Sequence, residues 1–320
     1  MKHKRLEMYL GWTCNHKCQF CIEMPTMDVM WDRVIPNKEV LKKLVKHKKL
    51  WYDHVTYLWW EPFIQKNFEF AIKVAKKLWF TVLVTTNAAT LQFDKIAKNY
   101  LPYIDQLIIS LPIVDKKLQP IINNTKSIID FDNVFSNIRK YWKGNLLKIN
   151  TVITPRNIDS LENIVEFINK YQVKEISFTY PDIYYDYYKK DNILENIAPS
   201  YTQVREKIQK PYELCKKYGI NVKIVDLPFC QLPNESMIAD TDDYSYQSRT
   251  KIHYSEISYT RVNSWPEFNE KNQKIDEYES LPRMRKIIQK CDSCKYNNLC
   301  WGPSHHYEKL FWLWEITPIK

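Results

Sequence analysis

The chain of 320 residues is 45% hydrophobic and carries a formal net charge of +10. This length is sufficient for a large core, and we expect one barrel with a smaller extension. A nucleic-acid partner is not expected despite the charge, because the basic residues are mostly Lys spread along the chain, whereas phosphate and guanine recognition favours Arg. We expect a cytoplasmic protein without a membrane partner, since no apolar run can span a bilayer and no secretion signal precedes the first strand.

The first expected strand, residues 6–10, is followed by a C-x3-C-x2-C run formed by Cys14, Cys18 and Cys21. Three thiolates at this spacing can hold three irons of a [4Fe–4S] cluster and leave the fourth iron open to a substrate. A zinc site is the alternative, although it would usually pair two C-x2-C motifs or add a pair of His residues. A disulfide is disfavoured because intracellular thiols are kept reduced.

This cysteine run resembles the signature of the radical S-adenosylmethionine (SAM) enzymes. In that family the open iron chelates the amino and carboxylate groups of SAM, and one electron from the cluster then splits the sulfonium and gives a 5′-deoxyadenosyl radical. The resemblance implies a [4Fe–4S] cluster on Cys14, Cys18 and Cys21, bound SAM, and an electron donor such as flavodoxin or ferredoxin.

Strand and helix signals alternate after the cysteine run, which is typical of βα units around a parallel sheet. Six such units resemble the partial (β/α)6 TIM-like barrel of the radical SAM core, an α/β fold that we expect over residues 1–200. Functional groups on such barrels gather at the C-terminal ends of the strands. In chain order the expected strands are residues 6–10, 54–58, 80–85, 106–110, 148–153, 175–179 and 221–225. The expected helices are residues 38–48, 65–78, 91–99, 132–142, 160–171, 201–218 and 281–289. Asn37 is the expected N-cap of the first of these helices.

Several loops after these strands carry residues that can be compared with the SAM-binding motifs of the family. Trp59-Trp60-Glu61-Pro62 stands where the family usually has Gly-Gly-Glu-Pro, whose backbone meets the SAM amino group, and Thr86-Asn87-Ala88 resembles its Thr-Asn-Gly turn. For Ser110 and Asn157 a turn or helix-capping role is the alternative. The resemblance implies SAM contacts for Trp59, Trp60, Glu61, Asn87, Ser110 and Asn157, and we assign no catalytic residue.

Tryptophan stands at several positions where chain geometry favours glycine. The chain has 4 Gly and 11 Trp, although glycine is usually about 7% of residues. Trp51 and Trp79 follow expected helices at a position that is commonly left-handed. We hypothesise that the source uses UGA as a glycine codon that has been translated as Trp, and the alternative is a degenerate protein that has lost SAM binding. The hypothesis covers Trp51, Trp59, Trp60, Trp79, Trp301, Trp312 and Trp314.

A second cysteine group lies in residues 201–320. Cys291, Cys294 and Cys300 form a C-x2-C-x5-C run, and Cys230 lies upstream. Four thiolates can close a second [4Fe–4S] cluster completely. The spacing resembles the Twitch or truncated SPASM extensions of radical SAM enzymes, so we expect a small α+β iron–sulfur extension with an auxiliary cluster. A structural zinc site on the same residues is the alternative.

Other residues have simpler explanations. The tyrosines within residues 180–188 can contact a substrate, but a covering loop is the favoured explanation. His305 and His306 can face solvent or pack, and Cys215 is expected to be an ordinary buried thiol. Residues 234–277 are expected to form a short hairpin and a loop.

These features predict a radical SAM enzyme that modifies a C–H bond of its substrate. Extensions of this type occur most often in enzymes that modify ribosomally made peptides, so we expect a peptide first and a small metabolite second. An RNA-modifying radical SAM enzyme is one alternative. A non-catalytic iron–sulfur electron-transfer protein is another, if Trp59 and Trp60 are genuine.

Overall fold

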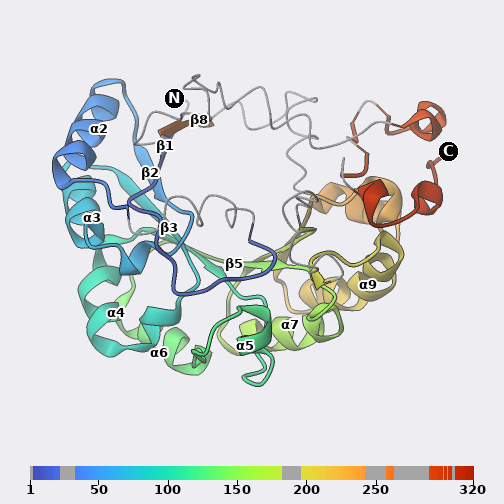
Figure 1. Ribbon diagram of the computed structural model, residues 1–320, viewed down its shortest axis with the longest axis horizontal. Coiled ribbons are helices and arrows are strands. Elements are labelled where there is room, and N and C mark those ends of the chain that lie inside the picture. The colour runs from blue at the N-terminus through green and yellow to red at the C-terminus, as the bar shows by residue number, and fades with distance from the viewer. Residues whose placement is uncertain are drawn as a thin grey trace. The chain divides into compact units, whose positions relative to one another are not determined.

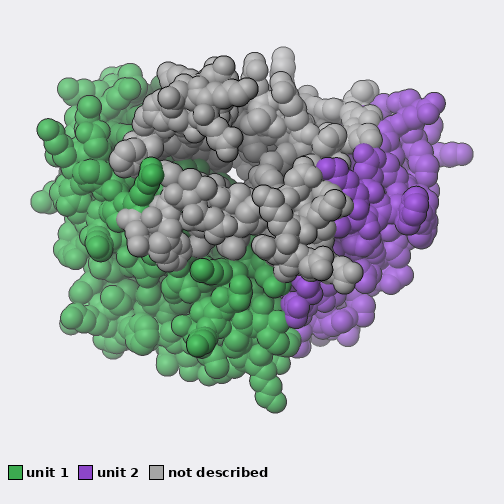
Figure 2. Space-filling view, in the orientation of Figure 1, with its two compact units in different colours: residues 1–149, 254–272 green, residues 150–253, 273–320 purple. Residues whose placement is uncertain are grey.

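The computed structural model (Figure 1) describes residues 3–21, 33–181, 196–241, 257–262, 288–297, 299–300, 302–304 and 307–320. The chain forms two compact units, coloured in Figure 2. The first contains residues 1–149 and 254–272, and the second contains residues 150–253 and 273–320. The expected boundary near residue 200 stays a prediction. Within the described residues no helix is both long and apolar enough to cross a membrane.

The first unit is built on parallel strands in the order β8-β1-β2-β3-β4-β5. Leu6, Val55 and Val82 lie opposite one another on neighbouring strands and are fully buried, so they form one apolar layer of the sheet. Such continuous burial is typical of parallel sheets with helices on their faces. The strands are β1 His3–Met8, β2 His54–Tyr57, β3 Thr81–Thr86, β4 Gln106–Ser110, β5 Leu146–Val152 and β8 Ile257–Val262.

Amphipathic helices cover the strands of the first unit, and Figure 1 shows α2, α3, α4 and α6 on their outer side. In α3 the buried residues Phe68, Ala71, Ile72 and Ala75 recur at the three- and four-residue spacing that forms one face of a helix. The helices are α2 Asn37–Lys49, α3 Phe68–Lys77, α4 Asp94–Tyr100, α5 Gln119–Ile122 and α6 Phe131–Tyr141.

The second unit has the strand order β5-β6-β7, because β5 passes from one unit into the other. Strands β6, Glu175–Thr179, and β7, Asn221–Val225, are parallel, and Phe178 lies opposite Ile224 in the core. Helices α7, Leu161–Lys170, and α9, Tyr201–Lys217, belong to this unit and contact each other. A short helix at Glu235–Asp240 follows β7.

The α/β fold class is confirmed, and β4, β6 and β7 have the predicted bounds. One smaller expectation is wrong, since Asn37 is the first residue of α2 and its N-cap is Pro36. Of the hairpin and loop expected at 234–277, residues 257–262 form β8, which pairs with β1 in parallel with His3 opposite Ile257. Residues 242–256 and 263–277 lie outside the described part of the chain. Most of the helix expected at 281–289 lies outside the described residues.

Candidate functional site

The three N-terminal cysteines lie on the loop that leaves the C-terminal end of β1. The Cys21 N–H donates to the Cys18 carbonyl at 3.0 Å, which closes a turn, and the His16 N–H lies 3.5 Å from Cys14 Sγ. Burial raises the pKa of Cys14 to about 12, with smaller contributions from Glu61 and Cys21. Burial and the two neighbouring thiols also raise the pKa of Cys18. Thiols in such surroundings become stable thiolates when a cation binds them, so the donor set fits an iron cluster.

Two asparagines from other loops reach this cysteine loop. Asn87, which follows β3, places its amide nitrogen 3.9 Å from Cys14 Sγ. Asn123, which follows α5, places its side-chain oxygen 3.8 Å from Cys18 Sγ, and its backbone carbonyl accepts the Lys17 N–H at 3.1 Å. Sequence reasoning missed Asn123, because no motif marks it and α5 was not predicted. Its 2% exposure is the structural signal that it has a role in the interior.

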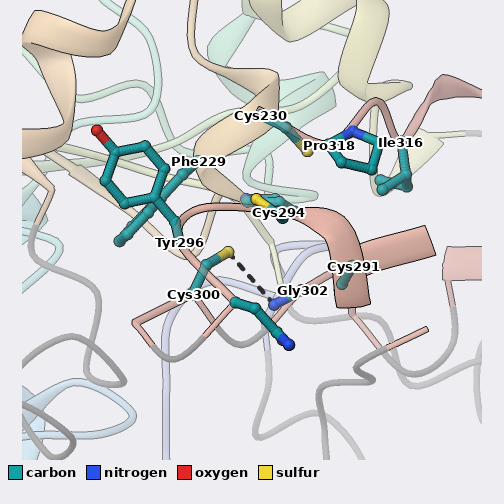
Figure 3. Close-up of a pocket in the computed structure, with 11 residues that line it drawn as sticks. Phe229, Cys230, Cys291, Cys294, Tyr296, Cys300, Gly302, Ile316 and Pro318 are labelled. Atoms are coloured by element: carbon teal, nitrogen blue, oxygen red, sulfur yellow. Dashed lines mark hydrogen bonds between the residues drawn. The ribbon is translucent and has the colours of Figure 1, made fainter. Parts of the chain in front are cut away.

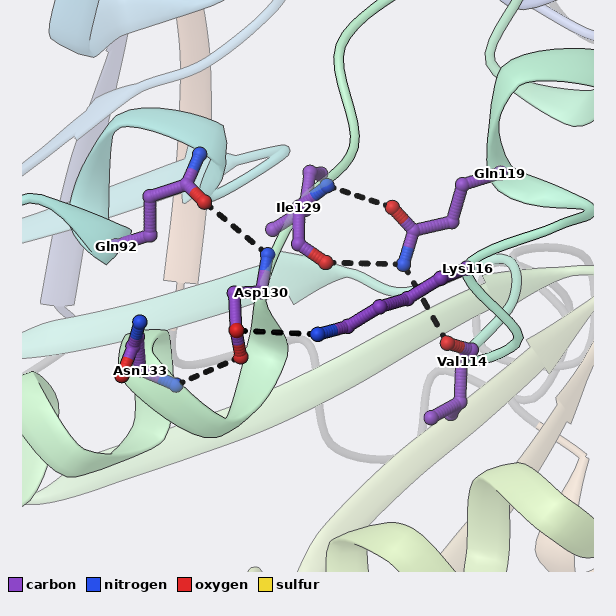
Figure 4. A network of polar contacts seen from close by, with 7 residues as sticks. All are labelled: Gln92, Val114, Lys116, Gln119, Ile129, Asp130 and Asn133. Carbon is purple, nitrogen blue, oxygen red and sulfur yellow. Dashed lines mark hydrogen bonds and ion pairs between the residues drawn. The ribbon is translucent and has the colours of Figure 1, made fainter.

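A buried amide fixes the short helix that carries Asn123 (Figure 4). The Gln119 side chain is fully buried and pairs with both backbone groups of Ile129. It accepts the Ile129 N–H at 2.7 Å and donates to the Ile129 carbonyl at 3.1 Å. The next residue, Asp130, accepts the Asn133 N–H at the start of α6. The position of α5 is therefore set by the polar groups between β4 and α6.

Glu61 connects the loop after β2 to the loop after β3. Its fully buried carboxylate accepts hydrogen bonds from the Thr86 hydroxyl and the Asn87 N–H, both at 2.8 Å, and from the Phe63 N–H at 3.1 Å. Burial raises the pKa of Glu61 to about 7, although these donors favour the ionised form. The side chain holds the turn that carries Asn87, and its predicted contact with SAM stays a prediction.

Trp59 and Trp60 have left-handed backbones, with φ of 63° and 46°. Their indoles lie beside the cysteine loop. The ring of Trp60 is 5.4 Å from Tyr9 and 5.8 Å from Trp12, and that of Trp59 is 6.3 Å from Tyr9. The buried indole N–H of Trp60 has no hydrogen-bond partner among the described residues. These side chains therefore fill the space in which the sequence predicts SAM.

The two remaining candidate SAM contacts lie in different units. Ser110 is the last residue of β4 and is half-buried. Asn157 belongs to the second unit and is fully buried; its side chain accepts the Thr154 N–H at 2.7 Å and donates to the Val152 carbonyl at 2.8 Å. These bonds give Asn157 the turn role that was its alternative explanation.

The second cysteine group lines one pocket of the second unit (Figure 3). N–H groups point at its sulfurs. The Gln231 amide lies 3.4 Å from Cys230 Sγ, and the Gly302 N–H lies 3.4 Å from Cys300 Sγ. Burial raises the pKa of Cys230, and Cys291 and Cys294 add to this effect. The walls are largely apolar. The pocket is lined by Pro228, Phe229, Cys230, Cys291, Cys294, Tyr296, Asn297, Cys300, Gly302, Ile316 and Pro318.

The C-terminal segment that supplies part of this pocket is fixed to the start of α9. The Tyr307 hydroxyl accepts the Tyr201 N–H at 2.8 Å, and the two rings stack with centroids 3.8 Å apart. Glu315 accepts the Thr202 N–H at 2.8 Å, while its backbone carbonyl accepts from Gln231. The first N–H groups of a helix have no partner inside the helix, so this segment acts as a cap for α9.

The remaining residues considered in the sequence lie either in the core or outside the described part of the chain. Cys215 is fully buried in α9, as predicted. Trp301, His305, His306 and residues 182–188 lie outside the described part of the chain. Within that part, no three His, Cys, Asp or Glu side chains are arranged to hold a single metal ion.

The chain is similar to known proteins in sequence and in fold. Residues 8–168 match the Radical SAM superfamily. A segment is 28% identical over 179 residues to an S-adenosylmethionine-dependent nucleotide dehydratase of Lacinutrix mariniflava, covering 53% of this chain and 36% of that protein. A second protein of that name, from Flammeovirga pacifica, is 26% identical over 172 residues, covering 51% and 58%. The matches span less than two thirds of either relative.

Solved structures share the fold at low sequence identity. Streptococcus suis SuiB bound to the precursor peptide SuiA has a TM-score of 0.65 and 17% identity, covering 95% of this chain and 72% of SuiB. The enzyme anSMEcpe with bound AdoMet and the Cp18Cys peptide has a TM-score of 0.60 and 14% identity, covering 94% and 88%.

Proposed function

This chain belongs to the radical SAM superfamily and is a SAM-dependent iron–sulfur enzyme, and we propose that Cys14, Cys18 and Cys21 hold the cluster that cleaves SAM. The observation that carries the proposal is the placement of all three thiols on one loop at the C-terminal end of β1. When bound, the cluster and SAM supply a 5′-deoxyadenosyl radical that removes a hydrogen atom from the substrate.

The chain's own part is to position the cysteine loop and SAM. Asn123 holds the loop through the Lys17 N–H, and Glu61 holds the turn that carries Asn87. The backbone of residues 59–61 and the side chains of Asn87 and Ser110 are the proposed SAM contacts. Tyr9 and Trp12 are buried next to this region and keep water from it.

We propose further that Cys230, Cys291, Cys294 and Cys300 hold an auxiliary [4Fe–4S] cluster. The shared pocket, its apolar walls and the N–H groups at the sulfurs support this assignment. Hydrogen bonds to sulfur and low solvent exposure are the protein's means of setting the potential of such a cluster. Zinc on the same four cysteines is the alternative that metal analysis distinguishes.

A phosphorylated nucleotide is the first candidate substrate. Both matched relatives are named nucleotide dehydratases, and each is similar to about half of this chain. The exposed Lys17 lies inside the cysteine loop, and Arg33 lies at its base, where its carbonyl accepts the Trp12 N–H at 3.2 Å. An exposed cation on the cysteine loop, such as Lys17, favours a substrate with phosphate groups.

A peptide is the second candidate. SuiB, which resembles this chain over 95% of its length, was solved with a precursor peptide. The pocket of the second cysteine group lies in the region expected to resemble peptide-modifying enzymes.

The test is an anaerobic incubation of the native, cluster-loaded protein with SAM and dithionite. Ribonucleoside triphosphates and candidate peptides are added separately, and 5′-deoxyadenosine and product masses are measured. A nucleotide that stimulates 5′-deoxyadenosine formation and loses one water supports the first candidate. A Cys18→Ala variant should form no 5′-deoxyadenosine. Equal activity of that variant would contradict the assignment of the cluster.

A further inference from the structure

We propose that residues 51, 59, 60 and 79 are glycine in the native protein, and that the tryptophans stem from reading a glycine codon, UGA, as a tryptophan codon. At residues 59 and 60 the inference deepens the proposed function and rests on it, because these residues flank the proposed SAM site. At residues 51 and 79 it depends on backbone and exposure alone.

The backbone gives the first argument. Eight described residues other than glycine have positive φ, and four of them are tryptophans: Trp51 at 65°, Trp59 at 63°, Trp60 at 46° and Trp79 at 60°. Positive φ is accessible to glycine and tolerated by Asn and Asp, but it is a genuine outlier for a bulky residue. Trp59 and Trp60 are also consecutive, which makes a turn of two left-handed residues.

The ends of α2 and α3 give the second argument. At each end the tryptophan N–H bonds to the carbonyl three residues back, and the next N–H bonds to the carbonyl five residues back. Trp51 and Tyr52 form these bonds at 3.0 and 3.1 Å, and Trp79 and Phe80 form both at 3.0 Å. This pattern is the Schellman motif, whose left-handed residue is usually glycine.

The chain itself shows which residue this motif prefers. Helix α9 ends in the same two bonds, and its left-handed residue is Gly219 with φ of 64°. Helix α7 ends in the same way at Gln172, with φ of 57°. A flexible polar side chain is therefore tolerated at this position, but a bulky aromatic ring is unexpected there.

The side chains give the third argument. Trp51 is 84% exposed and Trp79 is 85% exposed, so most of each large ring lies in water. Trp142 is the internal contrast, because its φ is −92° and its indole N–H donates to the Ile104 carbonyl at 2.9 Å. Trp142 thus has an evident structural role, whereas Trp51 and Trp79 have a backbone and an environment that suit a residue without a side chain.

The same substitution has a direct consequence at the proposed SAM site. Trp60 packs against Tyr9 and Trp12, and its buried indole N–H has no hydrogen-bond partner in the described part of the chain. Glycines at 59 and 60 remove both indoles and leave open space beside the cysteine loop, where the bare backbone can approach a ligand. A degenerate enzyme could explain lost glycines at the ligand site, but not tryptophans at the ends of α2 and α3. Trp312 is outside the proposal, since its φ is −80°.

The first experiment is mass spectrometry of the protein isolated from its source organism. Tryptic peptides covering residues 50–66 and 78–95 contain all four positions, and a peptide that spans Trp142 is the control. We expect glycine at residues 51, 59, 60 and 79, and tryptophan at residue 142. Sequencing the gene should show UGA at the four positions and UGG at Trp142. Tryptophan in the native peptides would overturn the inference.

The second experiment separates this inference from the proposed function. A Trp51→Gly, Trp79→Gly variant, made without touching the site, should melt on the order of a few degrees higher than the chain as written, whereas Trp142→Gly should melt lower. A Trp59→Gly, Trp60→Gly variant should bind SAM, detected by a changed electron paramagnetic resonance spectrum of the reduced cluster. Glycine in the native peptides without SAM binding would refute the function and leave the inference intact. An unchanged or lower melting temperature of the Trp51→Gly, Trp79→Gly variant would contradict the inference that these residues are glycine in the native protein.

Discussion

The side-chain amide of Asn87 lies 3.9 Å from the sulfur of Cys14, so the loop after β3 contacts the first cysteine of the loop after β1. The same amide donates to Asn15 at 2.8 Å, which fixes its orientation. Asn123 lies beside Cys18 in a similar way, but its side-chain oxygen faces the sulfur, at 3.8 Å. The two ends of an amide are nearly indistinguishable by shape, so the Asn123 NH2 group can turn toward the sulfur once the thiol has lost its proton.

Removing the Asn123 amide should lower the reduction potential of the first cluster. An N–H donor stabilises the extra negative charge of a reduced cluster, so Asn123→Ala is expected to shift the potential downward on the order of tens of millivolts. The measurement is a redox titration followed by electron paramagnetic resonance. Asn99→Ala is the control, because Asn99 is exposed on α4. An unchanged potential in Asn123→Ala with full iron content would show that the amide does not act on the cluster.

Stability of the cluster-free protein should fall as pH rises through about 7, because of Glu61. The folded state raises the pKa of this carboxyl above its ordinary 4.5, so it binds a proton that the unfolded chain releases between the two values. The stabilisation is complete below about pH 4.5 and is lost as the pH rises to about 7. The free energy of unfolding is expected to fall by about 3 kcal/mol over this range.

Infrared spectroscopy and thermal unfolding check this pH dependence. The carboxylic acid band of Glu61 should disappear as pH rises through about 7, and Glu61→Gln should lack both the band and the associated change in melting temperature. Persistence of the same pH dependence in Glu61→Gln would assign it to another group.

Losing the hydroxyl of Tyr307 should destabilise the second unit by about 1–3 kcal/mol, because the Tyr201 N–H is then left buried without its acceptor. Tyr307→Phe keeps the stacked ring and removes only this bond. Denaturant unfolding measures the loss, and the iron content of the second site should fall with it. Tyr218→Phe is the matched control, since its hydroxyl bonds to Glu166 in an exposed position of the same unit. Similar losses in both variants would contradict the capping role.

The two cysteine groups should load independently. The reconstituted protein is expected to bind about eight irons, and Ala substitution of Cys14, Cys18 and Cys21 together should leave about four. Ala substitution of Cys230, Cys291, Cys294 and Cys300 should likewise remove about four irons. SAM cleavage by this variant is measured in a separate assay. Iron and zinc analysis of each variant is the measurement, and zinc in place of the second set of irons would favour the structural zinc alternative.

The sequence predicted the parts of the fold that depend on local pattern. Strands β4, β6 and β7 have the predicted bounds, because short apolar runs between polar turns set them. The left-handed position of Trp79 was also predicted correctly from the end of a helix. Strand β1 ends at Met8 rather than at residue 10, because the chain leaves the sheet and Gly11 pairs with Val34 instead.

Features that depend on distant partners were not predicted. Strand β8 is recognisable only through its pairing with β1, some 250 residues earlier in the chain. Helix α5 has four residues, including a proline, and is too short for its apolar residues to show a helical periodicity. Asn123 was missed for the same reason, since its role follows from where α5 places it.

The pocket around Cys230 has a consequence for the order in which the enzyme matures during synthesis. Ile316 and Pro318 form part of its wall, and Glu315 bonds to the residue next to Cys230. Cys230 therefore leaves the ribosome well before its surroundings exist. Asn87 and Asn123, whose side chains approach Cys14 and Cys18, both lie in the first half of the chain. If both proposed clusters form, we expect the residues around the first cysteine group to be synthesised before those that form the wall of the second pocket.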